Sequence, residues 1–489
     1  MTFMSDIRKI TRKMQRFRNK LSSLSKIVLC ATILIYIFYI GHVMLDFSEN
    51  DTTDQNPKAE AFVAIFSPTP AFPSLFKIHK RKFTHATVTT GSPSLSIAKK
   101  CTVTIAIILC EDDRYLSITK TNHTGSVYNT TSPNQHSTGR PAIAKNFSRQ
   151  INQTLVLLKS IAILSKFQVS RPQQPSPSSC VEVLLLSDKP THYKTISREL
   201  KSKWAMEFQQ FLKITHVPVR YPPGSAWMRK LFRPCATLRL FLSELLPDHD
   251  SVIYLDTDVI FFQSVQALWA QFSRFDGSHN NNNNIQDDKD KSTSRKIAAM
   301  APCLFHYGSS ANSVPYFGSS GLNAGIMLMN LTGMRWTQWT NKIRMVTTMF
   351  QDKIKLADQD ILNIYFHFFP EELHMLSCDW NFRPFQCRAG SYCEDAQLSH
   401  GISALHGNAL SFTPQGPEPL FRAIYQTFHW AKLDGNFSIV EFVDRLETAL
   451  LKAEETTTAH NSDCKRYGGF NVVALNRLYN IVERIEGVI

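Results

Sequence analysis

The most informative stretch of this chain is Val252-Ile253-Tyr254-Leu255-Asp256-Thr257-Asp258-Val259-Ile260-Phe261-Phe262. Its apolar start, Val252 to Leu255, is typical of a strand that is buried on both faces, as in the parallel sheets of α/β proteins. Such sheets bind ligands at the carboxyl ends of their strands, where Asp256 and Asp258 stand. Two buried carboxylates need a strong partner, and Mg²⁺ or Mn²⁺ is the obvious one. The alternative is a strand-end turn in which Asp256 caps a helix and Asp258 faces solvent.

The rest of the chain continues this pattern. Further apolar, strand-like runs lie at 103–109, 181–187, 297–301 and 323–330. Segments with helical spacing or character lie at 152–167, 230–246, 331–350 and 358–369. Strands that alternate with helices predict βαβ units, so the fold class is α/β with a mostly parallel central sheet.

The net charge of +14 is concentrated at the amino terminus. Residues 1–26 have one acid, Asp6, and the following basic residues: Arg8, Lys9, Arg12, Lys13, Arg16, Arg18, Lys20 and Lys26. The next stretch, from Ile27 to Leu45, has no Lys, Arg, Asp or Glu and is long enough to cross a bilayer. The positive-inside rule leaves residues 1–26 in the cytoplasm. We therefore predict a type II membrane protein held in the lipid bilayer by one transmembrane helix, and no nucleic-acid partner.

The predicted luminal part begins with a stem. Residues 46–100 are rich in Thr, Ser and Pro and lack a sustained period. A catalytic domain is predicted at 101–433, with surface insertions near 118–149 and 277–294, and a helical extension at 434–489. All candidate N-glycosylation sequons follow the anchor: Asn50, Asn122, Asn129, Asn146, Asn152, Asn330 and Asn436.

The chain has ten cysteines, and Cys30 lies in the predicted membrane segment. The other nine would face an oxidising lumen, where disulfides persist. Cys378, Cys387 and Cys393 are close enough in sequence for a local bridge, and the other pairings stay open. Because nine is odd, at least one thiol is free or paired between chains.

Several polar blocks follow Asp256-Thr257-Asp258 in a fixed order. They are Phe317-Gly318-Ser319-Ser320-Gly321-Leu322-Asn323-Ala324-Gly325, Asp358-Gln359-Asp360-Ile361-Leu362-Asn363, Trp380-Asn381-Phe382-Arg383-Pro384 and Leu405-His406-Gly407-Asn408. This ordered set resembles glycosyltransferase family 8, whose members are retaining nucleotide-sugar transferases. The glucoside xylosyltransferases are the most similar subfamily, also at Lys230-Leu231-Phe232-Arg233-Pro234-Cys235 and Arg239-Leu240-Phe241. The resemblance covers residues 101 to about 430 and implies a single GT-A-like, Rossmann-type nucleotide-sugar-binding domain.

The resemblance also implies a Mn²⁺ site formed by Asp256, Asp258 and His406. Carboxylate and imidazole ligands suit this ion, whereas a thiolate would be a poor choice. A histidine considered by itself is more often a hydrogen-bonded core or surface residue.

For the UDP-sugar donor the implied binding residues are Arg239, Asp256, Thr257, Asp258, Asn323, Ala324, Gly325, Asp358, Gln359, Gly407 and Asn408. Asp358 and Gln359 are the implied catalytic residues, and Trp380 and Asn381 are implied to lie near the acceptor. Each has a structural alternative. Gly325 could serve only a tight turn, Asp358 a helix cap, and Arg239 an ion pair. Trp380 and Asn381 could serve only to support the fold.

The implied reaction transfers xylose from UDP-xylose, in α-1,3 linkage and with retention, to O-linked glucose on EGF-like repeats of Notch-type glycoproteins. The family mechanism is a front-face attack in which the leaving phosphate helps to accept the acceptor's proton. Gln359 would support the oxocarbenium-like sugar. The expected location is the Golgi or endoplasmic reticulum membrane, with the catalytic domain in the lumen.

Other functions remain open. One is a family 8 enzyme with a different UDP-sugar or acceptor. Another is a catalytically silent, glycan-binding relative. A phosphotransferase with an Asp nucleophile is disfavoured, because that class has its Asp pair after the first strand of the domain.

Overall fold

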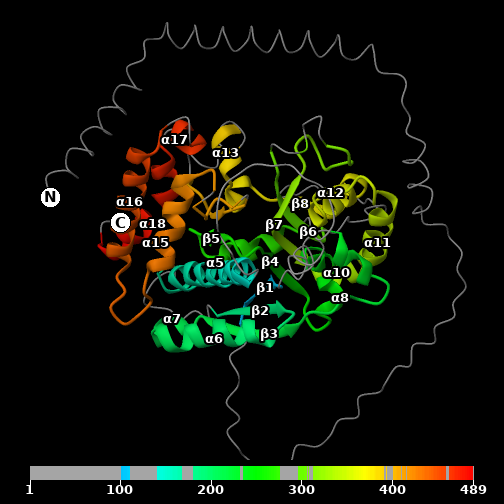
Figure 1. The fold of residues 1–489 in the computed structure, drawn as a ribbon, viewed down its shortest axis with the longest axis horizontal. Helices are drawn as coiled ribbons and strands as arrows, with labels where there is room; N and C mark the ends of the chain where they lie inside the picture. Colours follow the sequence, from blue (N-terminus) through cyan, green and yellow to red (C-terminus); the bar gives the residue numbers. More distant parts are fainter. Residues whose placement is uncertain are drawn as a thin grey trace, which may run out of the picture. The chain divides into compact units, whose positions relative to one another are not determined.

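The apolar runs of the sequence form the strands of one mixed sheet (Figure 1). The computed structural model describes residues 101–110, 140–167, 180–231, 235–275, 296–304, 307, 312–389, 393, 400–408, 410–414, 416–458, 462–467 and 469–487. These residues belong to a compact unit, Leu95–Ile489. The predicted tail, anchor and stem and the insertion at 277–294 lie outside the described residues. In the described part of the chain, no helix is both long enough and apolar enough to cross a membrane.

Seven strands form the main sheet in the order β3-β2-β1-β4-β7-β6-β8. Their bounds are β1 (Val103–Leu109), β2 (Val181–Ser187), β3 (Leu212–Pro218), β4 (Ser251–Leu255), β6 (Ala298–Pro302), β7 (Leu322–Asn330) and β8 (Leu373–Met375). Strands β3, β2, β1 and β4 are parallel, β7 runs antiparallel to both of its neighbours, and β8 is parallel to β6. The predicted α/β fold with a mostly parallel sheet is confirmed, and β7 supplies its antiparallel pairs.

The pairing of β4 with β7 positions the Asp-x-Asp segment. Leu255 pairs with Ile326, so the chain leaving β4 passes directly beside Gly325. The Asp256 amide donates to the Gly325 carbonyl over 2.8 Å. A second, two-stranded sheet follows, in which β5 (Val259–Phe261) pairs with β9 (Ala404–His406). His406 lies opposite Val259, and this register brings it to the Asp-x-Asp turn.

Helices surround the sheet. Those of the first half are α5 (Arg140–Phe167), α6 (Pro190–Lys203), α7 (Met206–Gln209), α8 (Leu242–Leu245) and α9 (Val265–Trp269). Those of the second half are α10 (Leu331–Trp336), α11 (Trp339–Met349), α12 (Asp358–Phe368), α13 (Pro384–Ala389), α15 (Pro419–Trp430), α16 (Ile439–Thr456), α17 (Asp463–Tyr467) and α18 (Phe470–Ile485). The 3₁₀ segments are η1 (Ala226–Lys230), η2 (Ala236–Phe241), η3 (Ala270–Arg274), η4 (Pro370–Glu372) and η5 (Cys378–Asn381). In Figure 1, α15, α16 and α18 lie at one end of the sheet and α10, α11 and α12 at the other.

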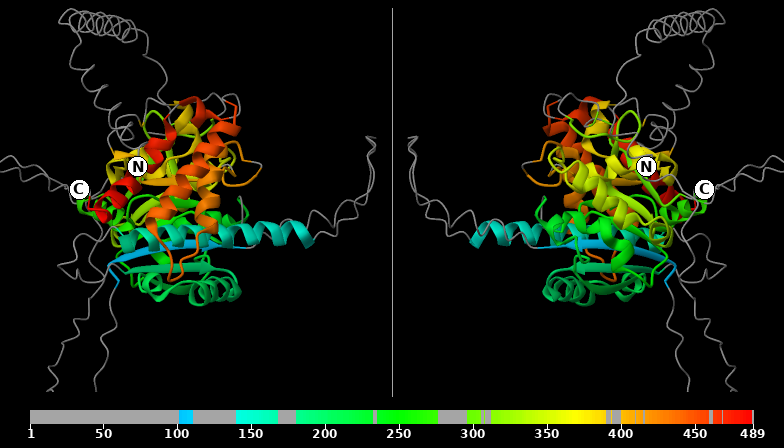
Figure 2. Two further views of the ribbon diagram at one scale, coloured as in Figure 1. Left: turned by 90° about the vertical axis from the view of Figure 1, so that its left-hand side faces the viewer. Right: turned by 90° about the vertical axis from the view of Figure 1, so that its right-hand side faces the viewer.

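Helix α5 is longer than predicted. The sequence pattern indicated a helix from 152 and an insertion near 118–149, but α5 already begins at Arg140. The helix start was predicted too late because Pro141 suggested a break in the helix. Proline is tolerated in the first turn of a helix, and Pro141 lies in that turn of α5. Figure 2 shows α5 in cyan beside β1 in blue, with its first turns extending past the other elements.

Two other predicted helices are interrupted. The segment 230–246 forms η1, η2 and α8, because Cys235 has φ +66° and is bonded to Cys110. The segment 331–350 forms α10 and α11, which are separated at Gln338 with φ +56°. Apolar spacing at the helical period continues across both breaks, so the sequence pattern alone did not reveal them.

Three of the four disulfides in the described residues connect positions far apart in the sequence. The pairs are Cys101–Cys180, Cys110–Cys235, Cys378–Cys393 and Cys387–Cys464. The predicted local bridge is therefore Cys378–Cys393, whereas Cys387 pairs with the C-terminal segment. Cys303 is buried and free, which agrees with the odd number of cysteines, nine, that follow the predicted membrane segment.

Helix α18 is attached to the segment that precedes β9. Arg477 of α18 donates to Asp379 over 3.4 Å and to the Gly401 carbonyl over 3.3 Å. Asp379 also accepts from Ser403 over 2.5 Å. The C-terminal residues 434–489 thus contact both η5 and the chain that leads into β9.

We expect Arg477→Ala to lower the free energy of unfolding by about 1–3 kcal/mol, because Asp379 is buried and would lose a charged partner. The measurement is the midpoint of urea unfolding. The matched control is Arg484→Ala, an exposed position on the same helix, which should change stability by less than about 0.5 kcal/mol. Equal midpoints for the two variants would contradict this role of Arg477.

Candidate active site

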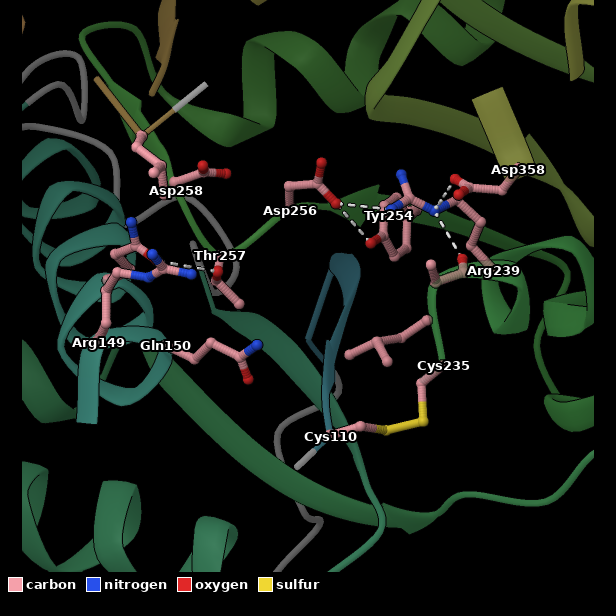
Figure 3. A pocket seen from close by; sticks show the side chains of 14 residues that line it. Cys110, Arg149, Gln150, Cys235, Arg239, Tyr254, Asp256, Thr257, Asp258 and Asp358 are labelled. Carbon is pink, nitrogen blue, oxygen red and sulfur yellow. Dashed lines mark hydrogen bonds and ion pairs between the residues drawn. A yellow bond between two sulfur atoms is a disulfide. The ribbon is translucent and has the colours of Figure 1, made fainter. Parts of the chain in front are cut away.

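A pocket of about 300 Å³ opens beside the Asp-x-Asp turn (Figure 3). It is lined by Ile108, Cys110, Arg149, Gln150, Gln153, Cys235, Ala236, Arg239, Tyr254, Asp256, Thr257, Asp258, Asp358 and Leu410. Figure 3 shows Arg149 and Gln150 of α5 on one side of the pocket and Arg239 with Asp358 on the other. The predicted donor residues Arg239, Asp256, Thr257, Asp258 and Asp358 therefore share one cavity.

Asp256, Asp258 and His406 form a candidate metal centre. One ligand atom from each residue lies within 4.8 Å of the others. His406 Nε2 is 3.6 Å from Asp256 Oδ2 and 3.4 Å from Asp258 Oδ1. The turn after β4 supplies the carboxylates, and β9 supplies the imidazole. Two hard oxygen ligands and one imidazole fit Mn²⁺.

Glycine at position 325 makes room for this imidazole. A Cβ on Gly325 would lie 2.1 Å from Cε1 of His406, closer than any real contact. The ring therefore packs directly over the main chain of β7. Close approach of a side chain to the backbone, rather than a positive φ, is the reason for glycine here.

We expect Gly325→Ala to weaken Mn²⁺ affinity by at least about 10-fold, because the new methyl group would push His406 away from the carboxylates. Titration calorimetry with MnCl₂ measures the effect. Gly435→Ala is the matched control, since a Cβ there meets nothing within 4 Å. Wild-type affinity in Gly325→Ala would show that His406 does not need this space.

Arg239 connects the two sides of the pocket. Its guanidinium lies 2.9 Å from Asp256 Oδ1 and 2.8 Å from Asp358 Oδ2. It also donates to the Ala324 carbonyl over 2.6 Å and lies over the Tyr254 ring at 4.2 Å. Tyr254 in turn donates to Asp256 Oδ1 over 2.7 Å. A buried arginine held on four sides fixes the carboxylates on which the site depends.

Burial and charge shift the acidities of these groups. Burial would lower the pKa of Arg239, but Asp256 and Asp358 raise it above its usual value. Burial raises the pKa of Asp358 to about 6, although the charge of Arg239 opposes this. Burial alone would raise the pKa of Asp258, but the hydrogen bond and charge of His406 bring it below its usual value. Asp258 is therefore a carboxylate at neutral pH.

The other predicted donor residues lie on β7 and at the start of α12. Gln359 Oε1 accepts from Asn323 Nδ2 over 2.9 Å and from the Ala324 amide over 3.4 Å. Gly325 donates its amide to Asn323 Oδ1 over 3.1 Å. The segments Asn323–Gly325 and Asp358–Gln359 are thus one hydrogen-bonded unit next to Arg239.

Asp360 has a structural role in the Asp-Gln-Asp triplet. Its Oδ1 accepts from the Tyr307 hydroxyl over 2.7 Å, and its Oδ2 accepts from the amides of Lys355 and Leu356 over 2.7 Å each. These bonds hold the loop before α12, so Asp360 fixes the approach to the helix while Asp358 faces the pocket.

The remaining predicted residues are placed in different ways. Thr257 lies 3.5 Å from Gln153 Oε1, and the Gly407 amide donates to the Asp258 carbonyl over 2.7 Å. Asn408 follows β9 but does not line the pocket. The acceptor assignment of Trp380 and Asn381 is not supported, because their exposed fractions are 6% and 0%.

Several pocket residues were missed in the sequence. Arg149 and Gln150 of α5 were missed because the helix start was placed too late, and Gln153 was missed although it lies inside the predicted helix. Tyr254 carried a usable signal, since it stands two residues before Asp256 and alternate residues of a strand share a face. The Cys110–Cys235 disulfide was missed because cysteine pairing depends on the tertiary fold.

One predicted glycosylation position is contradicted by its surroundings. Asn330 is 8% exposed, and its Oδ1 accepts from the Gly333 amide as the N-cap of α10. A glycan there would need surface that the side chain lacks. Asn436 is exposed, and Asn152 is half-buried on α5. Asn146 lies on α5 without a described side chain, and Asn50, Asn122 and Asn129 lie outside the described residues.

Comparison with known proteins agrees with this geometry. The profile of Glycosyl transferase family 8 matches residues 190–400, which include both aspartates of the turn and α12. Glucoside xylosyltransferase 1 of Danio rerio is 31% identical over 385 residues, covering 74% of this chain and 84% of the relative. The chain belongs to glycosyltransferase family 8.

Other relatives in family 8 match over shorter segments. Glucoside xylosyltransferase 1 of Homo sapiens is 35% identical over 51% of this chain and 56% of the relative. Glucoside xylosyltransferase 2 of Xenopus laevis is 33% identical over 48% of this chain, which spans 54% of that relative. Among solved structures, the apo form of mouse xyloside xylosyltransferase 1 matches with 13% identity and a TM-score of 0.38, over 64% of this chain and 99% of that one.

Proposed function

We propose that this family 8 glycosyltransferase transfers xylose from UDP-xylose to a glucoside. The proposed acceptor is O-linked glucose on EGF-like repeats of Notch-type glycoproteins, and the proposed product is an α-1,3 linkage formed with retention. Support for the sugar and the acceptor class comes from the similarity to proteins named glucoside xylosyltransferases. Support for the chemistry comes from the residues of the pocket.

The observation that carries the proposal is that His406 meets Asp256 and Asp258, and both of these aspartates line the pocket. In this proposal the three residues hold Mn²⁺. When bound, the ion supplies positive charge that binds the donor diphosphate and stabilises the leaving UDP. The space that Gly325 leaves for the His406 ring and the ionised state of Asp258 agree with a metal centre.

The basic side chains of the pocket suit an anionic donor. Arg149 reaches the pocket from α5, and Arg239 reaches it from η2. The guanidinium of Arg239 already balances Asp256 and Asp358. Arg149 lines the pocket, and we assign its guanidinium to the diphosphate because guanidinium pairs well with phosphate oxygens.

The state of the carboxylates supports a front-face reaction. Asp360 accepts three hydrogen bonds and does not line the pocket, and Asp358 is paired with Arg239. Neither is placed as a free nucleophile for a covalent glycosyl-enzyme, unlike the second carboxylate of retaining glycoside hydrolases. In the proposed step the bond from C1 to the diphosphate breaks as the acceptor oxygen bonds to C1 on the same face. The acceptor's proton passes to the departing phosphate oxygen, and Gln359 supports the charge on the sugar.

We also propose the Golgi or endoplasmic reticulum membrane as the location, with Ile27–Leu45 as a type II anchor and the catalytic domain in the lumen. The basic residues before this stretch and the sequons after it support this orientation.

A donor panel tests the proposal. The whole chain in detergent with MnCl₂ would be assayed for UDP release from UDP-xylose, UDP-glucose, UDP-galactose and UDP-glucuronic acid, with and without an α- or β-glucoside. We expect release from UDP-xylose that requires a β-glucoside and stops with EDTA. Preference for another donor would overturn the sugar assignment. UDP binding without any turnover would point to another acceptor or to a glycan-binding relative.

A further inference from the structure

Asn381 lies behind the metal centre and bonds in two directions. It has no exposed surface and is not part of the pocket lining. Its Nδ2 donates to Asn323 Oδ1 over 2.9 Å, and its Oδ1 lies 2.9 Å from Nδ1 of His406. A chain of side chains therefore leads from Gln359 through Asn323 and Asn381 to His406.

Main-chain amides fix the direction of this chain. The Gly325 N–H can only donate, so the atom of Asn323 that faces it over 3.1 Å is the amide oxygen. The NH₂ group of Asn323 then faces Gln359. The Ala324 N–H donates to the same atom of Gln359, which must therefore be its oxygen. The side-chain amides of Asn323 and Gln359 therefore each have only one orientation that is compatible with these hydrogen bonds.

The same logic extends to His406. Because Asn381 faces the oxygen of Asn323, it presents its NH₂ group there and its oxygen to the imidazole. An amide oxygen cannot donate, so Nδ1 of His406 carries the hydrogen. The other nitrogen, Nε2, faces Asp256 and Asp258 at 3.6 and 3.4 Å. When a cation replaces a proton at this position, Nε2 is the nitrogen that supplies the lone pair.

We propose that Asn381 is a positioning residue that holds His406 as the Nδ1–H tautomer and presents Nε2 to the divalent cation. This inference rests on the proposed metal centre. A partner that fixes the tautomer and the ring orientation of a ligating histidine is commonly required for full metal affinity. The buried position of Asn381 next to Trp380 agrees with such a role.

Titration of the whole chain with MnCl₂ tests the inference in a double-mutant cycle. Asn381→Ala should weaken Mn²⁺ binding about 10–100-fold. His406→Ala should also weaken it, and adding Asn381→Ala to His406→Ala should cause no further loss, because Asn381 acts only through the imidazole. Asn341→Ala, at an exposed position on α11, is the control and should bind as wild type. Equal losses from Asn381→Ala in both backgrounds would overturn the inference.

The tautomer of His406 can be measured directly, without adding metal and without a variant of Asn381. In ¹⁵N-histidine-labelled, metal-free chain at a pH where the ring is neutral, the signals that disappear in His406→Ala should show Nδ1 protonated and Nε2 unprotonated. A neutral ring protonated at Nε2 would overturn the inference even if Mn²⁺ binds. A wild-type chain that does not bind Mn²⁺ would instead contradict the proposed function, and the ¹⁵N spectrum would still decide the tautomer.

Discussion

Asp258→Asn is expected to lower Mn²⁺-dependent turnover by at least about 10²–10³-fold, the range found when one group that stabilises developing charge is removed. Asp258 is ionised at neutral pH because His406 holds its pKa below the usual value. Asparagine keeps the shape but offers a neutral oxygen, so the cation that would hold the diphosphate loses one charged ligand. The fold should persist, because the Asp258 carbonyl still accepts from the Gly407 amide over 2.7 Å.

The measurement is UDP release with UDP-xylose and a β-glucoside across a MnCl₂ titration. Asp352→Asn, an exposed position before α12, is the matched control and should match wild type. Wild-type turnover of Asp258→Asn at every Mn²⁺ concentration would remove Asp258 from the metal centre.

Arg239→Met is expected to lower the free energy of unfolding by about 3–5 kcal/mol, because removing one partner leaves buried charge uncompensated. The side chain of Arg239 is 9% exposed and that of Asp358 is 8% exposed. Methionine keeps an unbranched side chain, but it is uncharged and cannot balance either carboxylate. Donor binding should weaken in parallel, since Asp256 loses its partner on the side opposite the metal.

The loss in Arg239→Met should depend on pH with a defined sign. Asp358 has a pKa of about 6 in the folded protein, above its ordinary value of 3.8, and burial is the main cause. A carboxyl with a raised pKa stabilises the folded state when protonated, and this stability is lost as pH rises through the folded pKa. Without Arg239 the pKa of Asp358 should rise further, so the destabilisation should be smaller near pH 5 than near pH 7.5.

Urea midpoints of Arg239→Met and wild type at about pH 5 and about pH 7.5 measure this difference. Arg445→Met is the control, because its side chain is 63% exposed and its ion pair to Glu441 spans 4.0 Å. A deficit in Arg239→Met that is equal at both pH values would contradict the role assigned to Asp358.

Much of the sheet followed from local sequence pattern. The runs at 103–109, 181–187 and 323–330 correspond to β1, β2 and β7, because continuous apolar stretches of this length need burial on both faces. The breaks at Cys235 and Gln338 did not follow, since a left-handed residue leaves apolar spacing unchanged. The start of α5 was also missed, and with it the part of the pocket wall that Arg149 and Gln150 supply.

The site was also predicted only in part, because a local motif does not show the tertiary contacts of its side chains. Asp256 and Asp258 were identifiable because their chemistry and their strand lie in one short segment. Asn381 was assigned to the acceptor, but it is buried behind His406. A sequence motif shows which side chains are present. It does not show whether a given side chain contacts the substrate or only other side chains of the protein.

Local sequence pattern was enough to identify the runs that form β1, β2, β4, β6 and β7, the ligand types at Asp256, Asp258 and His406, and the glycine at 325. These depend on local periodicity and on the chemistry of single residues. Only the tertiary structure decided that β5 pairs with β9, which brings His406 to the aspartates across 148 positions of sequence. It also decided that Arg239 lies between Asp256 and Asp358, and that amide hydrogens orient His406 through Asn381. Hydrogen bonds and ion pairs act over about 3 Å, and only the folded chain sets which distant groups come that close.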